Sequence, residues 1–223
     1  MKKSGKISGL YAIIDTALVK PGRIGETARK ILSGGAGIIQ LRSKDSGDSG
    51  DLSSKEFLDA AKTLKKLTVK YNAVFIVNDR VDIALISGAD GVHLGQKDLP
   101  PRIARKLLGK NKMVGLSTHT TAEASRAGKL ASKGLVDYIS FGPVFSTKTK
   151  KNARKAVGTA KLKKVKKSVN LPVVAIGGIK EENIPEVLKT GVDSVAMISG
   201  ILEAKDIQSK ISSISAAIKS LKS

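Results

Sequence analysis

The sequence contains no cysteine and few aromatic residues. Its 223 residues include no tryptophan, 3 tyrosines and 4 phenylalanines. Without cysteine, the chain can form neither a disulfide bond nor a thiolate metal site. With 41% hydrophobic residues it can still bury a proper core, so wholesale disorder is not expected.

Long hydrophobic runs are also absent. No apolar stretch approaches the length of a bilayer span, and the opening residues MKKSGKISGL lack the long apolar segment of a secretory signal peptide. We therefore expect a cytoplasmic protein that makes no use of a membrane.

Acidic residues are scarce relative to basic ones. Forty Lys and Arg residues against nineteen Asp and Glu residues give a net charge of +21, and residues 148–167 hold ten basic residues and no acid. Such a charge attracts nucleic acid, anionic lipid or phosphorylated small molecules. The lack of aromatic residues for base stacking, and of a recognisable binding motif, argues against nucleic acid. We expect phosphorylated small molecules as ligands, many of the lysines lying on solvated helix surfaces.

Short, β-branched apolar runs alternate with segments of helical periodicity. The runs occupy residues 10–15, 37–42, 73–78, 91–94, 113–117, 136–142, 172–178 and 194–199, and helical patterns cover residues 56–69 and 186–189. Continuous apolar strands separated by helices are typical of buried parallel strands joined by crossovers. The pattern predicts an α/β fold, a (β/α)8 TIM barrel that forms one domain over residues 1–223. An open doubly wound sheet stays an alternative, because periodicity does not report closure.

An internal repeat favours the barrel. GGAGIIQL, SGADGVHL, KGLVDYIS and TGVDSVAM each run from a glycine through two or three small or acidic residues into a strand. The glycines Gly35, Gly88, Gly134 and Gly191 are 53, 46 and 57 residues apart, about the length of two βα units. We expect each glycine to end a helix in a left-handed cap just before strands two, four, six and eight.

Residues 45–51, DSGDSGD, interrupt this rhythm with a polar, low-complexity run. We interpret it as a lengthened, flexible βα loop within the barrel domain. Its alternating aspartates could bind calcium, but the segment lacks the closing glutamate of a known calcium loop.

The ends of the expected strands carry the chemically useful side chains. In a TIM barrel, residues at the carboxyl ends of the strands face the active-site mouth. Here these ends supply cations, amides, hydroxyls, glycines and carboxylates, a set that suits an anionic, phosphorylated ligand and a hard metal ion. There is no evident Ser-His-Asp arrangement and no pair of histidines at metal spacing. We interpret His93 and His119 as structural residues and leave them out of the site.

Two aspartates, Asp79 and Asp98, each follow an apolar run by a few residues. Turn and cap chemistry would permit either acid at its position. Because both lie beside Arg42, Lys44 and Lys150 in the expected mouth, we favour a shared metal site over turn chemistry alone.

Several motifs give the chain a resemblance to the thiamine-phosphate synthase (thiamine-phosphate pyrophosphorylase) family. They are QLRSK at 40–44, VNDRVDIALISGADGVHLGQKD at 77–98, GLSTH at 115–119, GPVFSTKTK at 142–150, AIGGIKEEN at 175–183 and VAMISGI at 195–201. The resemblance covers almost the whole chain. Departures from the family pattern are the extra loop length at residues 46–51, Ser146 where proline is usual, and the lysine excess after Lys150.

The resemblance implies a magnesium-dependent transferase that joins hydroxymethylpyrimidine diphosphate to a thiazole phosphate and releases pyrophosphate. It implies a pyrimidine diphosphate site of Gln40, Arg42, Lys44, Asn78, Ser117 and Lys150, with Arg42, Lys44 and Lys150 assisting catalysis. It implies a thiazole phosphate site of Thr147, Lys148, Thr149, Gly178, Ile198 and Ser199. Asp79 and Asp98 would bind Mg²⁺.

Two other functions and several details stay open at this point. The thiazole tautomerase branch resembles this family in fold but does not use the diphosphate, and a basic nucleic-acid-binding protein is a weaker alternative. The sequence allows a homo-oligomer and either form, plain or carboxylated, of the thiazole phosphate.

Overall fold

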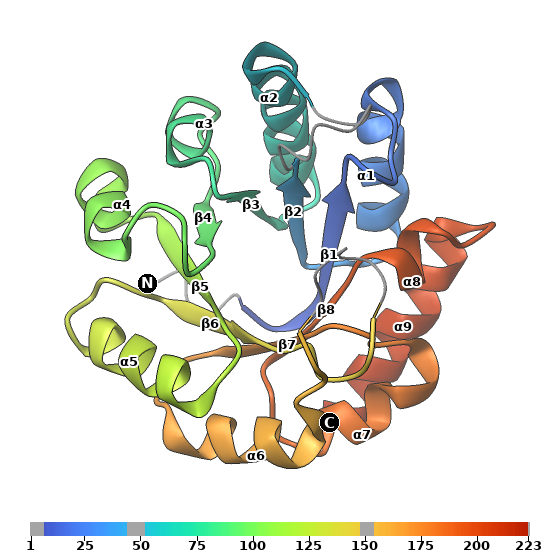
Figure 1. The fold of residues 1–223 in the computed structure, drawn as a ribbon. Helices are drawn as coiled ribbons and strands as arrows, with labels where there is room; N and C mark the ends of the chain where they lie inside the picture. The colour runs from blue at the N-terminus through green and yellow to red at the C-terminus, as the bar shows by residue number, and fades with distance from the viewer. Residues whose placement is uncertain (1–6, 44–51, 148–153, 223) are drawn as a thin grey trace.

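Eight parallel strands close into a barrel within the residues that the computed structural model describes, 7–43, 52–147 and 154–222. The strands are β1 Gly9–Asp15, β2 Ile38–Arg42, β3 Val74–Asn78, β4 Gly91–Leu94, β5 Met113–Thr118, β6 Tyr138–Phe141, β7 Val173–Ile176 and β8 Ser194–Met197. Each strand pairs with its neighbour in the chain, and β8 pairs with β1 (Figure 1). The predicted TIM barrel is confirmed, and the open sheet is excluded.

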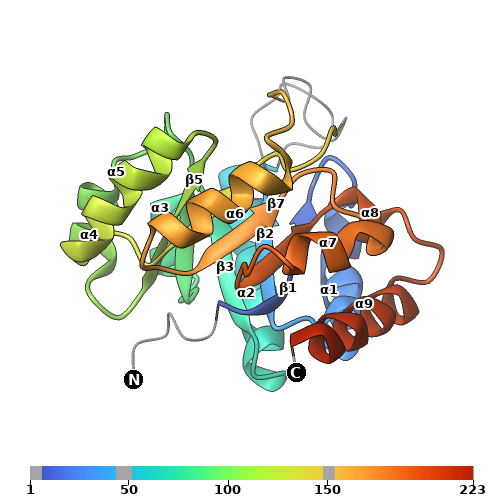
Figure 2. The same ribbon diagram turned by 90° about the horizontal axis from the view of Figure 1, so that it is seen from below.

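Helices surround this barrel (Figures 1 and 2). They are α1 Ile24–Ser33, α2 Ser54–Lys70, α3 Val81–Ile86, α4 Pro101–Leu108, α5 Thr121–Ser132, α6 Gly158–Ser168, α7 Ile184–Leu188, α8 Ser199–Leu202 and α9 Ile207–Lys222, with short 3-10 turns at Pro21–Arg23 and Glu181–Asn183. Helix α9 lies beside α1 and so closes the ring of helices. No described helix combines the length and apolar character needed to cross a membrane.

The strands predicted at residues 172–178 and 194–199 extend beyond the carboxyl ends of the observed strands. β7 ends at Ile176, so Gly177 and Gly178 lie in a bend, and β8 ends at Met197, so Ser199 begins the short helix α8. Small and apolar residues at both places extend the strand-like pattern, although the backbone has already turned. The segment after β7 therefore reaches the mouth of the barrel as a bend, and the segment after β8 reaches it as the start of a helix.

Side chains alternate between two apolar layers along each strand. On β1, Tyr11 and Ile13 point into the barrel, whereas Leu10, Ala12 and Ile14 pack in the layer beneath the helices. Strands buried on both faces explain why the sequence shows continuous apolar runs instead of alternation.

The repeated glycines adopt the predicted left-handed backbone. Gly35, Gly88, Gly134 and Gly191 have φ values of 96°, 72°, 70° and 85°, each just before an even-numbered strand. This conformation is costly for residues with a Cβ atom, which explains glycine at all four positions. The prediction from the internal repeat is confirmed.

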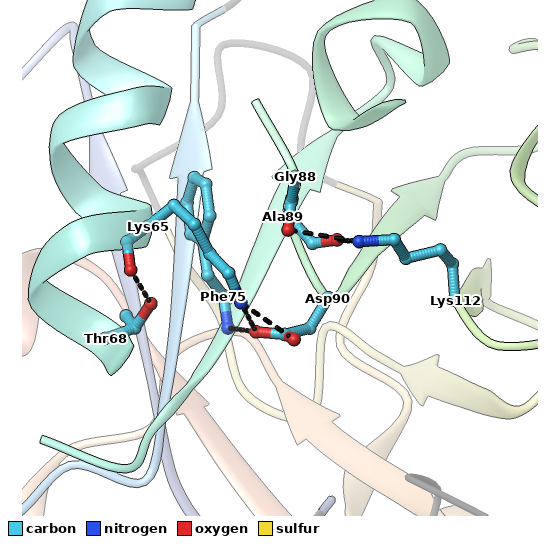
Figure 3. A network of polar contacts seen from close by, with 7 residues as sticks. All are labelled: Lys65, Thr68, Phe75, Gly88, Ala89, Asp90 and Lys112. Carbon is cyan, nitrogen blue, oxygen red and sulfur yellow. Dashed lines mark hydrogen bonds and ion pairs between the residues drawn. The ribbon is translucent and has the colours of Figure 1, made fainter. Parts of the chain in front are cut away.

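An aspartate clamp follows three of these glycines at the base of the barrel. Figure 3 shows the first one, in which Asp90 accepts hydrogen bonds from the Lys65 ammonium at 2.9 Å and from the Phe75 backbone N–H at 3.0 Å. Asp137 and Asp193 repeat the arrangement. Asp137 pairs with Arg105 and accepts from the backbone N–H of Val114 in β5, and Asp193 pairs with Lys166 and accepts from the backbone N–H of Val173 in β7. These contacts tie helices to strands at the end opposite the mouth, where they serve stability.

The loop predicted at residues 45–51 lies outside the described residues, so its flexibility stays a prediction.

Candidate active site

Two adjoining hollows lie at the carboxyl ends of the strands. The larger has a volume of about 750 Å³ and lies among the segments that follow β1, β6, β7 and β8. The smaller, of about 50 Å³, lies deeper in the barrel and is bordered by residues of all eight strands, with Asn78 as the contribution of β3. Both are lined by His119, Ile176, Ala196 and Ile198, so they share a wall.

Described members of the two predicted substrate sets fall in different hollows, except that Ile198 lines both. Gln40, Arg42, Asn78 and Ser117 line the smaller hollow. Thr147, Gly178, Ile198 and Ser199 line the larger one. Lys44, Lys148, Thr149 and Lys150 lie outside the described residues. Asp79 and Asp98 line neither hollow; Asp79 directly follows Asn78 at the end of β3, and Asp98 lies between β4 and α4.

Arg42 is held at the mouth by a carboxylate. Its guanidinium donates to Oδ2 of Asp15, the residue opposite it in the pairing of β1 with β2. The Asp15 carboxylate is 3% exposed and also accepts from the Ala17 backbone N–H at 3.1 Å. Asp15 therefore balances the charge of Arg42 without any ligand, and burial of Arg42 is not by itself evidence of an anionic ligand. The pair instead fixes the direction of the guanidinium.

Gln40 and Asn78 present amide groups in the smaller hollow. Gln40 is 3% exposed, and its Nε2 donates to the Tyr11 hydroxyl at 2.7 Å. Asn78 is 6% exposed, and its Nδ2 has no hydrogen-bond partner among the described residues. A buried donor without a partner is costly, so Asn78 Nδ2 points to a ligand that supplies an acceptor.

A buried polar chain continues from Gln40 across the barrel interior. The hydroxyls of Tyr11 and Tyr138 are 3.0 Å apart, and Tyr138 lies 3.1 Å from His93 Nδ1. His93 Nε2 lies 2.9 Å from Ser117 Oγ. Burial raises the pKa of Tyr11 and of Tyr138 well above the ordinary phenol value, so both hydroxyls stay protonated.

Asp79 has an unusual backbone. Its φ of 60° is in the left-handed region, which few residues other than glycine adopt, and its N–H donates to the His93 carbonyl at 2.9 Å. Strained backbone of this kind gathers at functional sites. Asp98 lies in the turn after β4, where its Oδ2 accepts from the Gly95 N–H at 2.6 Å.

The wall of the larger hollow uses glycine for close packing. Gly178 has a φ of 65°, and a Cβ atom there would lie 2.5 Å from the Ser146 carbonyl oxygen. No larger residue fits without moving this segment, so the loops after β6 and β7 pack backbone to backbone. Their polar backbone groups lie beside Ser199 and Thr147. The same hollow is lined by basic side chains and by acidic ones, and Lys180 and Lys210 pair with Glu182 and Glu181.

Sequence reasoning assigned no role to Asp15, Tyr11, Tyr138 or Ser140, and it interpreted His93 as structural. Tyr11 and Tyr138 are 127 residues apart, so no local pattern connects them. One signal was available in Gly115, a glycine inside a strand. A Cβ atom there would lie 2.2 Å from Tyr138 Cζ and 2.5 Å from His93 Nδ1. Glycine within a strand marks such close approach.

Chemically, the mouth offers cations, amide donors and acceptors, and carboxylates, and its described residues contain no cluster of three or more His, Asp or Glu side chains able to hold a metal. An arrangement of this kind positions anionic ligands and stabilises charge on a leaving group.

Known proteins are similar to this chain in sequence and in fold. A family model described as thiamine monophosphate synthase matches residues 10–201. The thiamine-phosphate synthase of Clostridium novyi is 41% identical over 199 residues, covering 89% of this chain and 93% of its own. That of Lawsonia intracellularis is 44% identical over 209 residues, covering 94% and 92%.

A solved structure agrees. The thiamine phosphate pyrophosphorylase from Pyrococcus furiosus superimposes with a TM-score of 0.84 at 37% identity and covers 99% of both chains. Together with the matched family model, this shows that the chain belongs to the thiamine monophosphate synthase family, whose members are transferases of thiamine biosynthesis.

Proposed function

We propose that this chain joins 4-amino-2-methyl-5-hydroxymethylpyrimidine diphosphate to hydroxyethylthiazole phosphate, giving thiamine monophosphate and pyrophosphate. With the carboxylated form of the thiazole phosphate, the carboxylate would also leave as CO₂. The bond between the pyrimidine CH₂ carbon and the diphosphate oxygen breaks, and pyrophosphate leaves with the electron pair. The thiazole nitrogen supplies the pair for the new carbon–nitrogen bond.

The adjoining hollows are the observation that carries the proposal. A condensation needs two ligands side by side, with their reacting atoms in contact. The shared wall of Ile176, Ala196 and Ile198 would bring a ring in the smaller hollow against a ring in the larger one. The larger hollow has the volume of a small-molecule site, whereas the smaller one would take only part of a ligand.

The amides suit an aminopyrimidine. Because Gln40 Nε2 already donates to Tyr11, the Gln40 carbonyl oxygen is left to accept from the exocyclic amine. Asn78 Nδ2 would donate to an acceptor of the same substrate.

The diphosphate would lie among Arg42, Ser117, Lys44 and Lys150. Negative charge grows on this group as the carbon–oxygen bond breaks, and fixed cations stabilise it. Since the pyrimidine amino group can share positive charge at carbon, a dissociative displacement is expected. The thiazole nitrogen needs no protein base, which agrees with the absence of a catalytic dyad from the predicted site.

The second substrate would place its phosphate near Gly178, Ser199 and Thr147, with Lys148 and Thr149 as further contacts. Gly178 keeps two backbone segments close together, and a Cβ atom would break this packing. Backbone N–H groups and hydroxyls of such loops suit phosphate.

The residues beside the diphosphate position fit Mg²⁺ as cofactor. Asp79 and Asp98 offer oxygen donors only, and Mg²⁺ commonly binds one or two carboxylates together with substrate phosphates. When bound, the ion would stabilise negative charge on the departing pyrophosphate. The strained backbone of Asp79 supports a role beyond a turn.

The direct test mixes both substrates with the purified chain and Mg²⁺ and measures pyrophosphate. We expect release that requires both substrates. If no pyrophosphate forms while a thiazole carboxylate phosphate isomer is interconverted, the chain is a tautomerase-like relative instead.

A further inference from the structure

Five side chains form one path of hydrogen-bond contacts, and four of them, all except Tyr138, line the smaller hollow. The path runs from Gln40 Nε2 to Tyr11 at 2.7 Å, on to Tyr138 at 3.0 Å, to His93 Nδ1 at 3.1 Å, and from His93 Nε2 to Ser117 Oγ at 2.9 Å. Gln40 and Ser117 both line the hollow, on β2 and β5. The path therefore starts and ends at positions where a ligand would bind.

The direction of the first two bonds follows from the amide of Gln40. Its Nε2 can only donate, so the Tyr11 hydroxyl oxygen accepts. The single hydrogen of Tyr11 is then directed to the Tyr138 oxygen, and Tyr138 must pass its own hydrogen onward. The protonated state of both phenols, which burial enforces, keeps one hydrogen on each oxygen.

The same logic sets the tautomer of His93. Because Tyr138 donates to Nδ1, that nitrogen carries no hydrogen, and the neutral ring holds its hydrogen on Nε2. Nε2–H then donates toward Ser117 Oγ at 2.9 Å, with Ser140 Oγ at 3.2 Å as a second acceptor. The hydroxyl hydrogen of Ser117 is thereby released for a ligand.

The packing holds this geometry in place. Tyr11 is 2% and Tyr138 0% exposed, and the rings of Tyr138 and His93 lie 5.4 Å apart beside Gly115. Neither phenol can turn to water for an alternative partner.

We propose that Tyr11, Tyr138 and His93 form a one-way hydrogen-bond relay that carries the donor direction from Gln40 to Ser117. Its consequence is that Ser117 donates to the substrate. The three residues orient the Ser117 hydroxyl and do not themselves contact the reacting atoms. The identity of the acceptor as a diphosphate oxygen rests on the proposed function.

Nuclear magnetic resonance of histidine side-chain nitrogens tests the relay without a ligand. The chain has only two histidines, so assignment is direct. We expect His93 to carry hydrogen on Nε2 alone. In Tyr11→Phe, which leaves the Tyr138–His93 contact intact but removes the source of direction, we expect a measurable Nδ1–H population.

The control is Tyr71→Phe. The hydrogen bond described for the Tyr71 hydroxyl is with Ser33, and neither residue belongs to the relay. It should leave the His93 signals unchanged. An Nδ1–H tautomer in the unmodified chain, or an unchanged tautomer in Tyr11→Phe, would overturn the relay.

Binding of inorganic pyrophosphate, measured by calorimetry, tests the consequence at Ser117. Tyr11→Phe should weaken binding about five-fold, the effect of one hydrogen bond, and should have no further effect in a Ser117→Ala background. Equal weakening in both backgrounds would contradict coupling through Ser117. If the unmodified chain binds no pyrophosphate, the proposed function fails, whereas the tautomer measurement still decides the relay.

Discussion

Arg42 reaches the mouth as half of a buried pair with Asp15, so its guanidinium is oriented before a ligand arrives. In Arg42→Lys, the charge and a contact with Asp15 survive, but the planar fork is lost. We expect kcat/KM, measured by pyrophosphate release, to fall at least about ten-fold with the melting temperature little changed.

The matched control is Arg105→Lys, which alters an Arg–Asp pair at the base of the barrel. It should lower the melting temperature and leave kcat/KM nearly unchanged. Equal losses of activity in both variants would show that Arg42 acts only through stability.

Asp79 and Asp98 provide the second prediction at this scale. Asn in place of either keeps the size and a hydrogen-bonding oxygen but removes the charge that, under the proposed function, would attract Mg²⁺. Each variant should need about ten times more Mg²⁺ for half-maximal rate, with lower turnover and normal circular dichroism. Wild-type Mg²⁺ dependence in both would remove them from the metal site.

At the scale of elements, the aspartate clamps join helix to strand. Asp90→Ala leaves the Phe75 N–H and the Lys65 ammonium without this carboxylate. Denaturant unfolding should show a loss of about 2 kcal/mol, because a buried N–H loses its acceptor. Activity per folded molecule should persist, since the clamp lies opposite the mouth. A loss of activity without a loss of stability would contradict this assignment.

Strands were readable from the sequence wherever burial on both faces produced an apolar run. The repeat around Gly35, Gly88, Gly134 and Gly191 also favoured the barrel over an open sheet, and all four glycines have the expected positive φ. The end of β7 before Gly177 and the start of a helix at Ser199 could not be predicted, since small and apolar residues continue the strand pattern.

Some residues of the candidate site could likewise be predicted from the sequence, and others could not. Gln40, Arg42, Asn78 and Ser117 could be found because strand ends point to the mouth, and they do line one hollow. The pairing of Asp15 with Arg42, and the contact of Tyr11 with Tyr138, depend on register and on the barrel interior. Local sequence carries no information about contacts of that range.

At the scale of the whole molecule, many of the lysines behind the net charge of +21 lie on exposed helix surfaces. On α6, Lys161, Lys163 and Lys164 are exposed, while Leu162 and Val165 pack inward, which is the pattern of a solvated face. We expect duplex DNA to bind at low salt and to be lost as salt is raised to physiological levels, because only lysine–phosphate attraction would hold it.

Filter retention across a salt series measures this loss. Strong retention at physiological salt that is unaffected by Arg42→Lys would instead support a nucleic-acid function located on the surface.

The most direct measurement of the central claim is a crystal structure of the chain with the pyrimidine diphosphate and Mg²⁺. The account predicts the pyrimidine ring in the smaller hollow between Gln40 and Asn78, the diphosphate at Arg42 and Ser117, and the metal on Asp79 and Asp98. A diphosphate bound in the larger hollow at Gly178 and Ser199, with the smaller one empty and no metal at the two aspartates, would contradict it.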